Sequence, residues 1–259
     1  MTILVTNDDG LTDGLKILIE AAIRLDNHVY AIIPTQQKSA FAKGVTLHKI
    51  LRLRKIDEEK FPIYELSGNP ADCVCFGIRS GEFKKPNLVL SGINISENLS
   101  FYSIYSSGTI GACIEAALYG IPAIAFSLER NATKKLKDSC SEAKTNKNAL
   151  KESIIRIIKK LHGKIQPYTI INVNFPENFN NAEIVFPKPA VFQSNSNVEK
   201  RLDPYDNPYY WHYLKTKECE KASDVYEFYV NRCITITPLS VLKIVDKAIL
   251  NKLKNSVKE

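Results

Sequence analysis

The first 176 residues alternate short apolar runs with segments of helical periodicity. The apolar runs have the continuous character of strands buried on both faces of a parallel sheet, and they lie at residues 2–6, 28–34, 87–92, 123–128 and 169–175. Helical spacing or a helix-start signal lies between them, at residues 14–25, 70–79, 108–119 and about 147–161. This order predicts a doubly wound, mostly parallel α/β sheet of the Rossmann-like kind, which forms the catalytic core over residues 1–176.

Two stretches depart from this order. Residues 45–68 alternate apolar and polar positions, which predicts two strands of an antiparallel excursion with a turn near Asp57–Lys60. Residues 177–220 are rich in Asn, Pro and aromatic residues and have little periodicity. A helix near Ala222–Tyr229, a strand over 233–239 and an amphipathic, Lys-rich helix over 241–259 should follow. We expect residues 177–259 to form an extension with an aromatic arm that contacts another subunit, and to complete the same domain.

The composition narrows the class of protein without identifying it. With 259 residues, 44% of them hydrophobic, the chain can bury the core of one large domain. We see no signal-peptide pattern and no apolar stretch of about 18 residues, so we expect a cytoplasmic protein outside the membrane. The six cysteines lack CxxC pairs and zinc-type spacing, which favours reduced core thiols. The net charge of +7 comes from scattered basic residues, so nucleic acid is not expected to be the main partner.

Polar side chains follow three of the predicted strands where parallel strands end. Asp8 and Asp9 follow the first strand, Ser39 lies in the loop after the second, and Asn94 and Asn98 follow the third. Ligands of open α/β sheets bind outside the carboxyl ends of the strands, so these side chains should meet at one site. Their donor atoms are all oxygen, with no His or Cys in the loops, which favours Mg²⁺ or Mn²⁺ over Zn²⁺.

A phosphate site is indicated at the start of the helix expected from residue 108. The sequence Ser106-Ser107-Gly108-Thr109 offers hydroxyl donors, free backbone N–H groups and the positive end of a helix. It is not a P-loop, because the GK[ST] ending is absent. A metal held by the two aspartates and facing this helix start predicts phosphoryl chemistry with a metal-activated water.

Each of these motifs also has an ordinary structural explanation. NDDG (7–10) is typical of a turn followed by a helix cap, SGIN (91–94) of a turn, and SSGT (106–109) of a helix N-cap. Their shared position at one edge of the sheet is what favours a functional site.

Taken in order, the motifs resemble those of the SurE family, the survival-protein nucleotidases. NDDG follows the first strand, SGIN follows a later one, a further Asn comes after it, and YSSGT (105–109) leads into a helix. Further matching segments are SGNPADCV (67–74), INVNFP (171–176), DPYDNPYYW (203–211) and SDVYEFYVNRCITITPL (223–239). The resemblance runs from residue 1 to about residue 240. Each motif alone is weak, but the set is specific.

The resemblance implies a metal-dependent phosphatase that hydrolyses nucleoside 5′- and 3′-monophosphates. It also implies an α/β domain whose C-terminal extension serves in homodimers or homotetramers. One divalent ion per subunit, Mg²⁺ or Mn²⁺, is expected. The family's metal ligands fall on Asp8, Asp9, Ser39 and Asn94. Of these, Asp8 and Asp9 are the catalytic candidates, and which one orients the attacking water or acts as a nucleophile stays open.

The family's phosphate-contacting positions fall on Asn98, Ser107, Gly108 and Thr109. The stretch between Asn98 and Gly108 is one residue longer here, so Ser106 and Ser107 are both candidates for one of these roles.

Three positions depart from the family's glycines. Ser96 and Ser100 stand in place of both glycines of the family's Asn-x-Gly-x-Asn-x-Gly loop, and Ala40 stands where Gly is common after Ser39. Because the metal ligands are intact, we expect activity. The changed loop bears on substrate preference.

Two other classes of function stay open. A non-catalytic nucleotide- or phosphate-binding assembly protein would result if the altered loop had removed activity. A receiver domain that accepts a phosphoryl group also has an acidic pair after its first strand, but it needs an Asp at the end of the third, where this chain has Ser91. The sequence does not determine the preferred base, the choice between 5′ and 3′ phosphates, the native metal or the size of the oligomer.

Overall fold

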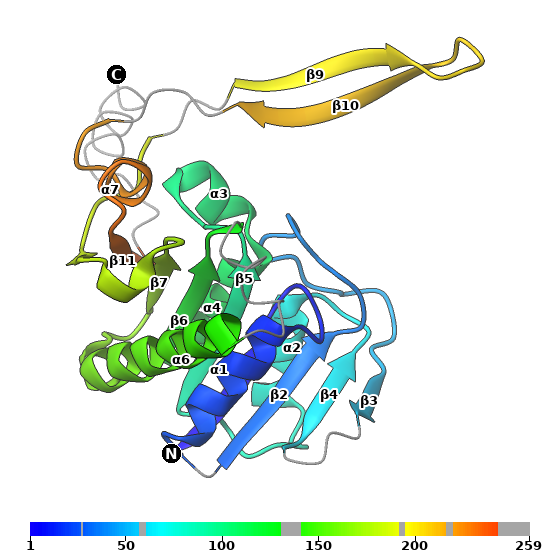
Figure 1. Ribbon diagram of the computed structural model, residues 1–259. Coiled ribbons are helices and arrows are strands. Elements are labelled where there is room, and N and C mark those ends of the chain that lie inside the picture. The colour runs from blue at the N-terminus through cyan, green and yellow to red at the C-terminus, as the bar shows by residue number, and fades with distance from the viewer. Residues whose placement is uncertain (27, 57–60, 131–140, 192–194, 216–219, 243–259) are drawn as a thin grey trace, which may run out of the picture.

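The computed structural model describes the chain except for residues 27, 57–60, 131–140, 192–194, 216–219 and 243–259 (Figure 1). The strands are β1 (Thr2–Thr6), β2 (His28–Pro34), β3 (Leu53–Ile56), β4 (Ile63–Leu66), β5 (Leu88–Ile95), β6 (Ala123–Leu128), β7 (Thr169–Phe175), β8 (Ile184–Val185), β9 (Asn195–Leu202), β10 (Pro208–Lys215) and β11 (Ile234–Ser240). The α-helices are α1 (Asp13–Ile23), α2 (Pro70–Arg79), α3 (Ser100–Ser106), α4 (Gly108–Leu118), α6 (Ser141–Leu161) and α7 (Asp224–Tyr229).

The main sheet is doubly wound, as the pattern of apolar runs predicts. Within the described residues it has nine strands, in the order β3-β4-β2-β1-β5-β6-β7-β11-β8. The strands from β4 to β7 are parallel, whereas β3 and β11 pair antiparallel with β4 and β7. The chain starts at β1, builds one side of the sheet, and returns to build the other from β5. The winding therefore reverses between β1 and β5, and the carboxyl ends of these two strands are where an α/β sheet binds its ligand.

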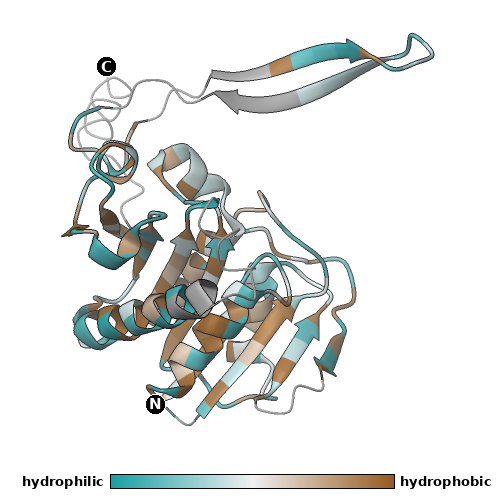
Figure 2. Ribbon diagram, viewed as in Figure 1, coloured by the Kyte–Doolittle hydropathy of each residue, from teal (hydrophilic) through white to brown (hydrophobic). Residues whose placement is uncertain are grey.

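Helices cover both faces of the sheet (Figure 1). Leu15 of α1 and Ile154 of α6 belong to the buried cluster on one face, and Val74 of α2 and Cys113 of α4 to the cluster on the other. Figure 2 shows apolar residues gathered on the strands and on the helix surfaces turned toward them. All residues of β1 and β6 are buried. Because neither face of these strands meets water, their sequences are apolar without alternation.

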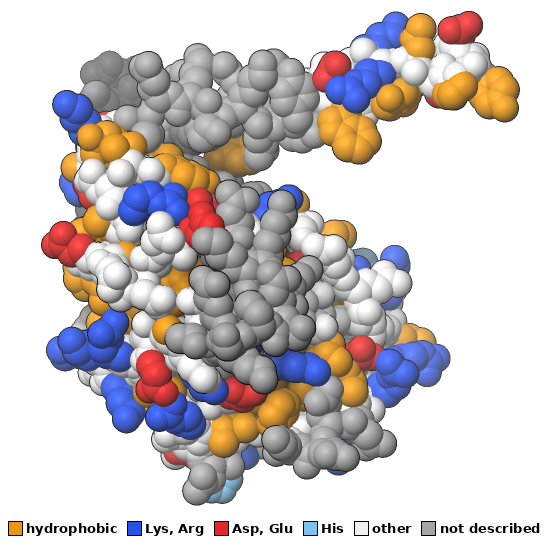
Figure 3. Space-filling view, viewed as in Figure 1, with side chains coloured by type: hydrophobic (Ala, Val, Ile, Leu, Met, Phe, Trp, Pro, Cys, Tyr) orange, Lys and Arg blue, Asp and Glu red, His pale blue; other side chains and the backbone are white. Residues whose placement is uncertain are grey.

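The C-terminal segment contributes both to the sheet and to a projecting arm. Strand β11 lies between β7 and β8, so it extends the main sheet. Strands β9 and β10 form an antiparallel hairpin of their own, which stands away from the core (Figures 1 and 3). No strand was predicted over 177–220, where the sequence has little periodicity, and the structure adds this hairpin there. Its strands pair with each other and do not show the alternation of a core-packed strand.

Other elements differ from the expectations at their boundaries. The strand expected from residue 45 is limited to Leu53–Ile56, and the turn expected near Asp57–Lys60 lies outside the described residues. The strand expected at 87–92 continues to Ile95, the helix expected from 147 begins at Ser141, and α3 was not predicted at all. Residues 243–259, which hold most of the expected terminal helix, lie outside the described part of the chain.

The described cysteines are free thiols, with Cys73, Cys113 and Cys233 buried as expected. Cys140 and Cys219 lie outside the described residues. Among the helices that the structure describes, none has the length and apolar character to cross a membrane.

Candidate functional site

The side chains that the sequence places at the carboxyl edge of the sheet meet around one cavity of about 320 Å³. Its wall includes the predicted residues Asp8, Asp9, Ser39, Asn94, Asn98, Ser106 and Ser107. Gly108 and Thr109 are not among the lining residues; they lie behind Asp8. The cavity therefore lies at the reversal point between β1 and β5, as the topology requires.

The NDDG turn is closed by its first and last residues. The Asn7 amide donates to the Gly10 carbonyl at 2.6 Å, and the Gly10 N–H donates to Asn7 Oδ1 at 3.1 Å. Gly10 has a φ of 78°, which favours glycine. The chain thus reverses directly after β1 and leaves both aspartates at the edge of the sheet.

Asp8 is a buried carboxylate held in one orientation. Its side chain accepts a hydrogen bond from Thr109 Oγ1 at 2.6 Å, and only 3% of the residue is exposed. A Cβ added at Gly108 would lie 2.9 Å from Asp8 Cβ, so glycine is needed where α4 approaches this residue. Burial raises the pKa of Asp8 to about 6; the Thr109 hydrogen bond opposes this shift and the charge of Asp9 adds to it.

Asp9 is partly exposed and is linked to Ser39 through a residue that the sequence analysis missed. Gln37 Nε2 donates to Asp9 Oδ1 at 2.9 Å and to Ser39 Oγ at 3.0 Å. Gln37 lies two residues before Ser39 in the same loop, and that position was the available signal. The amide therefore holds two of the predicted metal ligands together.

Asn94 presents an amide oxygen to the cavity. Its Nδ2 donates to the Ser96 carbonyl at 2.6 Å, which leaves Oδ1 for another partner. Ser96 and Ser100 have φ values of 138° and 63°, and Ala40 has a φ of 61°. At these three positions the resemblance implies glycine, and all three residues have the left-handed backbone that glycine favours. The loop thus makes glycine-type turns with residues that carry a Cβ.

Asn98 is fixed from two neighbouring strands. Its backbone N–H donates to Asn174 Oδ1 at 2.7 Å, and its side-chain Nδ2 donates to Ser127 Oγ at 2.9 Å. The Asn172 amide donates to the Asn98 carbonyl at 2.7 Å. These partners lie on β6 and β7, and their role was not visible in the sequence because the strands are distant along the chain.

The two candidate serines before α4 differ in their hydrogen bonds. Ser107 is the N-cap of α4, where its Oγ accepts the Ile110 N–H at 3.2 Å. Ser106 ends α3 and donates its hydroxyl to the Tyr102 carbonyl at 2.9 Å. The Ser107 hydroxyl proton is therefore available to an anion, whereas that of Ser106 is directed into its own helix.

Further residues of the cavity wall were missed by the sequence analysis. They are Glu97, Ser103 and Arg130. Arg130 follows the end of β6, a further carboxyl end at the same edge, and this was the available signal. Arg130 thus adds a basic side chain to the cavity wall.

The arrangement offers oxygen atoms suited to a cation and hydrogen-bond donors suited to an anion. Two adjacent carboxylates and an amide oxygen suit a hard cation, and a helix N-cap that shares the cavity wall with an arginine suits a phosphate. Within the described residues there is no cluster of three or more His, Cys, Asp and Glu side chains at metal-binding distance. A cation here would thus need neutral oxygen ligands as well as the carboxylates.

Comparisons with known proteins give a consistent result. Residues 3–196 match the model of the family described as survival protein SurE. The chain is 38% identical to the 5′-nucleotidase SurE of Thermofilum pendens over 246 residues, which cover 93% of this chain and 91% of the relative. It is 37% identical to the 5′-nucleotidase SurE of Methanosphaera stadtmanae, with coverages of 93% and 95%. The crystal structure of the SurE protein from Aquifex aeolicus superposes with a TM-score of 0.78 at 30% identity and covers 100% of both chains.

Proposed function

The chain belongs to the SurE family, and we propose that the site around Asp8 and Asp9 hydrolyses nucleoside monophosphates to nucleoside and phosphate. Family membership makes the chain a nucleotidase, a phosphoric monoester hydrolase. The observation that carries the assignment of the site is that two adjacent carboxylates, the Asn94 amide oxygen and the N-cap of α4 share one cavity.

The family depends on a metal, and the residues of the cavity fit a hard divalent cation. Asp8, Asp9 and Ser39 offer oxygen atoms, and Asn94 keeps its oxygen free by turning its nitrogen to the Ser96 carbonyl. A cation would also offset the repulsion between two adjacent carboxylates, one of them buried. We assign one Mg²⁺ or Mn²⁺ to these four residues. When bound, such an ion polarises a phosphate and lowers the pKa of a coordinated water.

The phosphate would be bound from the side of α4. Ser107 can donate its hydroxyl proton to a phosphate oxygen, so we assign phosphate binding to Ser107 rather than Ser106. Asn98 and the basic side chain of Arg130 also line the cavity. Gly108 begins α4 behind Asp8, so we assign it a contribution through the positive end of the helix. Thr109 is turned to Asp8, so its part is to hold that carboxylate.

The two aspartates differ in a way that divides their work. Asp8 is buried and fixed, which suits a metal ligand, whereas Asp9 is partly exposed and lines the cavity, where a water can reach it. We assign Asp9 to orient the attacking water. The water oxygen attacks phosphorus as the ester P–O bond breaks. The water proton passes by way of Asp9 to the leaving nucleoside oxygen or to solvent.

The C-terminal segment is assigned to assembly. The β9–β10 hairpin exposes Tyr209, Tyr210 and Trp211 and stands away from the core (Figure 3). An exposed aromatic row of this kind is typical of a surface that a partner covers, so we propose that it joins subunits of a homodimer or homotetramer. We place the protein in the cytoplasm, where free thiols such as Cys73 and Cys113 stay reduced.

A metal-titrated assay tests the function. The full chain is stripped with a chelator and offered adenosine, guanosine and uridine 5′-monophosphates, adenosine 3′-monophosphate and a phosphodiester. We expect release of phosphate from the monoesters only after Mg²⁺ or Mn²⁺ is added, and none from the diester. If no monoester is hydrolysed with either metal while nucleotide still binds, the chain is a non-catalytic binding protein and the proposal fails.

A further inference from the structure

Helix α7 lies against the segment that follows Asn94 in the candidate site (Figure 1). At the start of α7, the Asp224 carboxylate accepts the Ser100 N–H at 2.9 Å. In its middle, Val225 and Phe228 share a buried cluster with Leu99. The helix thus contacts two successive residues of the loop, both a few positions beyond the proposed metal ligand.

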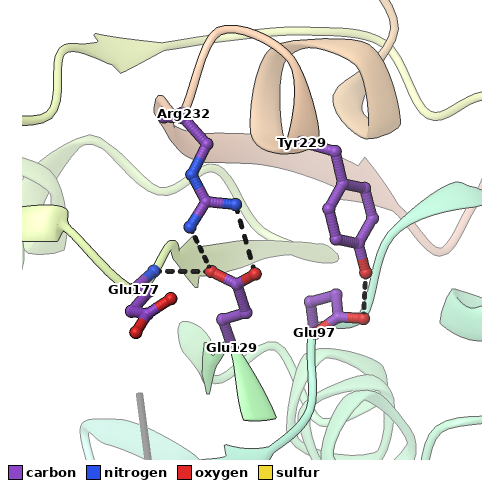
Figure 4. A network of polar contacts seen from close by, with 5 residues as sticks. All are labelled: Glu97, Glu129, Glu177, Tyr229 and Arg232. Carbon is purple, nitrogen blue, oxygen red and sulfur yellow. Dashed lines mark hydrogen bonds and ion pairs between the residues drawn. The ribbon is translucent and has the colours of Figure 1, made fainter. Parts of the chain in front are cut away.

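The end of α7 makes a third contact with the loop, at a residue of the cavity wall. The Tyr229 hydroxyl donates to Glu97 Oε1 (Figure 4). Glu97 lines the cavity between Asn94 and Asn98. Tyr229 is 41% exposed as a residue. Partial desolvation, the hydrogen bond to Glu97 and the charge of Glu97 raise the pKa of Tyr229, so its hydroxyl keeps the proton that it donates.

The position of Tyr229 is itself fixed by the turn that follows it. Arg232 forms a two-pronged ion pair with Glu129, with contacts of 3.1 and 2.6 Å, and Glu129 also accepts the Glu177 N–H at 2.6 Å (Figure 4). Glu129 is buried and directly precedes Arg130 of the cavity wall. Arg232 keeps a left-handed φ of 57°, which is unfavourable for a residue with a side chain, so the surrounding contacts must hold it there. The turn after α7 is therefore anchored to the edge of the sheet.

The loop needs such support because its own backbone does not favour the observed shape. Ser96 and Ser100 both have positive φ values, which glycine adopts without strain and serine does not. Asn94 lies in β5 and Asn98 is bonded to β6 and β7, so what the segment 96–100 adds is the Ser96 carbonyl that orients the Asn94 amide. Without outside contacts, the segment would populate other conformations and this carbonyl would leave its place.

We propose that Tyr229 is a positioning residue for this site: through its hydrogen bond to Glu97 it holds the loop between Asn94 and Asn98, whose Ser96 carbonyl orients the Asn94 amide for the metal. This role rests on the proposed function, because it names what the loop presents. Asp224 and the Arg232–Glu129 pair support it by fixing the two ends of α7. A loop that is competent in only a fraction of the molecules weakens metal and substrate binding by that fraction, whereas turnover at saturation changes little.

The test is the variant Tyr229→Phe, which removes the hydroxyl and keeps the ring, with Tyr226→Phe of the same helix as the matched control. We expect Tyr229→Phe to raise the Kd for Mn²⁺, measured by isothermal titration calorimetry, by about three- to tenfold. The KM for adenosine 5′-monophosphate should rise by a similar factor, with kcat within about twofold of the wild type. The melting temperature of Tyr229→Phe should equal that of the wild type, and so should the Kd for Mn²⁺ and the KM of the Tyr226→Phe control. In the background Glu97→Ala, the change at Tyr229 should have no further effect, because its partner is gone.

Two results would overturn the proposal. One is a Kd for Mn²⁺ and a KM for Tyr229→Phe equal to those of the wild type. The other is an undiminished effect of Tyr229→Phe in the Glu97→Ala background, which would show that the hydroxyl acts elsewhere. If the wild type releases no phosphate with any metal, the proposed function fails, whereas the Mn²⁺ titration still decides whether Tyr229 positions the loop.

Discussion

The carboxyl edge of the sheet and the β9–β10 hairpin place their side chains under opposite constraints. At the edge, Asp8 and Asn98 are buried and bonded to residues far away in the sequence. On the hairpin, Tyr209, Tyr210 and Trp211 are exposed, and the strands pair only with each other among the described elements. The edge is thus preorganised by its own fold, whereas the hairpin offers a surface that its own core does not use. This difference matches the roles proposed for the two regions, chemistry at the edge and assembly on the hairpin.

The largest effect is expected at the edge. Replacement Asp8→Asn should lower the metal-dependent phosphatase rate by about a thousandfold or more, because a proposed metal ligand loses its charge. The same change should stabilise the metal-free fold near neutral pH by on the order of 1 kcal/mol, because a buried charge beside Asp9 is removed. Phosphate release and thermal unfolding in chelator measure the two effects. The exposed Asp13→Asn is the charge-matched control, and a fully active Asp8→Asn would remove this residue from the site.

Changes on the hairpin should alter the assembly of subunits and leave the activity of each chain intact. Tyr209 and Trp211 are two positions apart on β10 and so share one face. The double change Tyr209→Ser and Trp211→Ser should reduce the molar mass in light scattering toward that of one chain. The kcat/KM per chain should stay within about twofold, because the edge is built without the hairpin. Tyr205→Ser, in the turn of the hairpin, serves as the control. A loss of activity as large as that of Asp8→Asn would contradict the separation of the two regions.

A smaller effect at the edge tests preorganisation itself. Thr109→Val keeps the shape of the side chain and removes the hydrogen bond to Asp8, so kcat/KM should fall by about tenfold. Thr109→Ser should restore most of it. Equal activity of the wild type, Thr109→Val and Thr109→Ser would show that this hydrogen bond does not orient the Asp8 carboxylate.

The smallest effect concerns the left-handed serines. Ser96→Gly and Ser100→Gly should each raise the free energy of unfolding by about 0.5–1 kcal/mol, because glycine adopts a positive φ without the clash of a Cβ. Ser103→Gly, inside α3, should lower it by about the same amount. Chemical denaturation measures all three. If both loop changes destabilise the protein as Ser103→Gly does, the left-handed backbone is not a source of strain.

The sequence predicts the two regions with different success for a physical reason. Strands such as β1 and β6 are buried on both faces, so their apolar composition alone marks them. The hairpin segments NSNVEKRL and PYYWHYLK have no core to face, so their pairing leaves no apolar alternation to read. Helix α3 was missed for a related reason, since SFYSIYS is short and has only Ser100 and Ile104 buried.

The candidate site, too, could be predicted only where a pattern in the sequence marks its residues. Asp8, Asp9, Ser39 and Asn94 could be placed together because parallel strands bring their carboxyl ends to one edge. Gln37 and Arg130 also follow strand ends, so their place at this edge could have been predicted. Their contacts, and the place of Glu97, depend on how the loops fold back. Tyr229 lies still further along the chain, and only the packing of α7 brings it to Glu97 of the cavity wall.

The most direct test of the account is the release of phosphate from adenosine 5′-monophosphate by the chelator-treated chain as Mn²⁺ is titrated, for the wild type, Asp9→Asn and Asp13→Asn. We expect saturable, Mn²⁺-dependent release by the wild type and by Asp13→Asn, and a rate about a thousandfold lower for Asp9→Asn, with its fold intact by circular dichroism. Release by Asp9→Asn at the wild-type rate, or release by the wild type that does not depend on metal, would contradict the assignment of the reaction to this edge of the sheet.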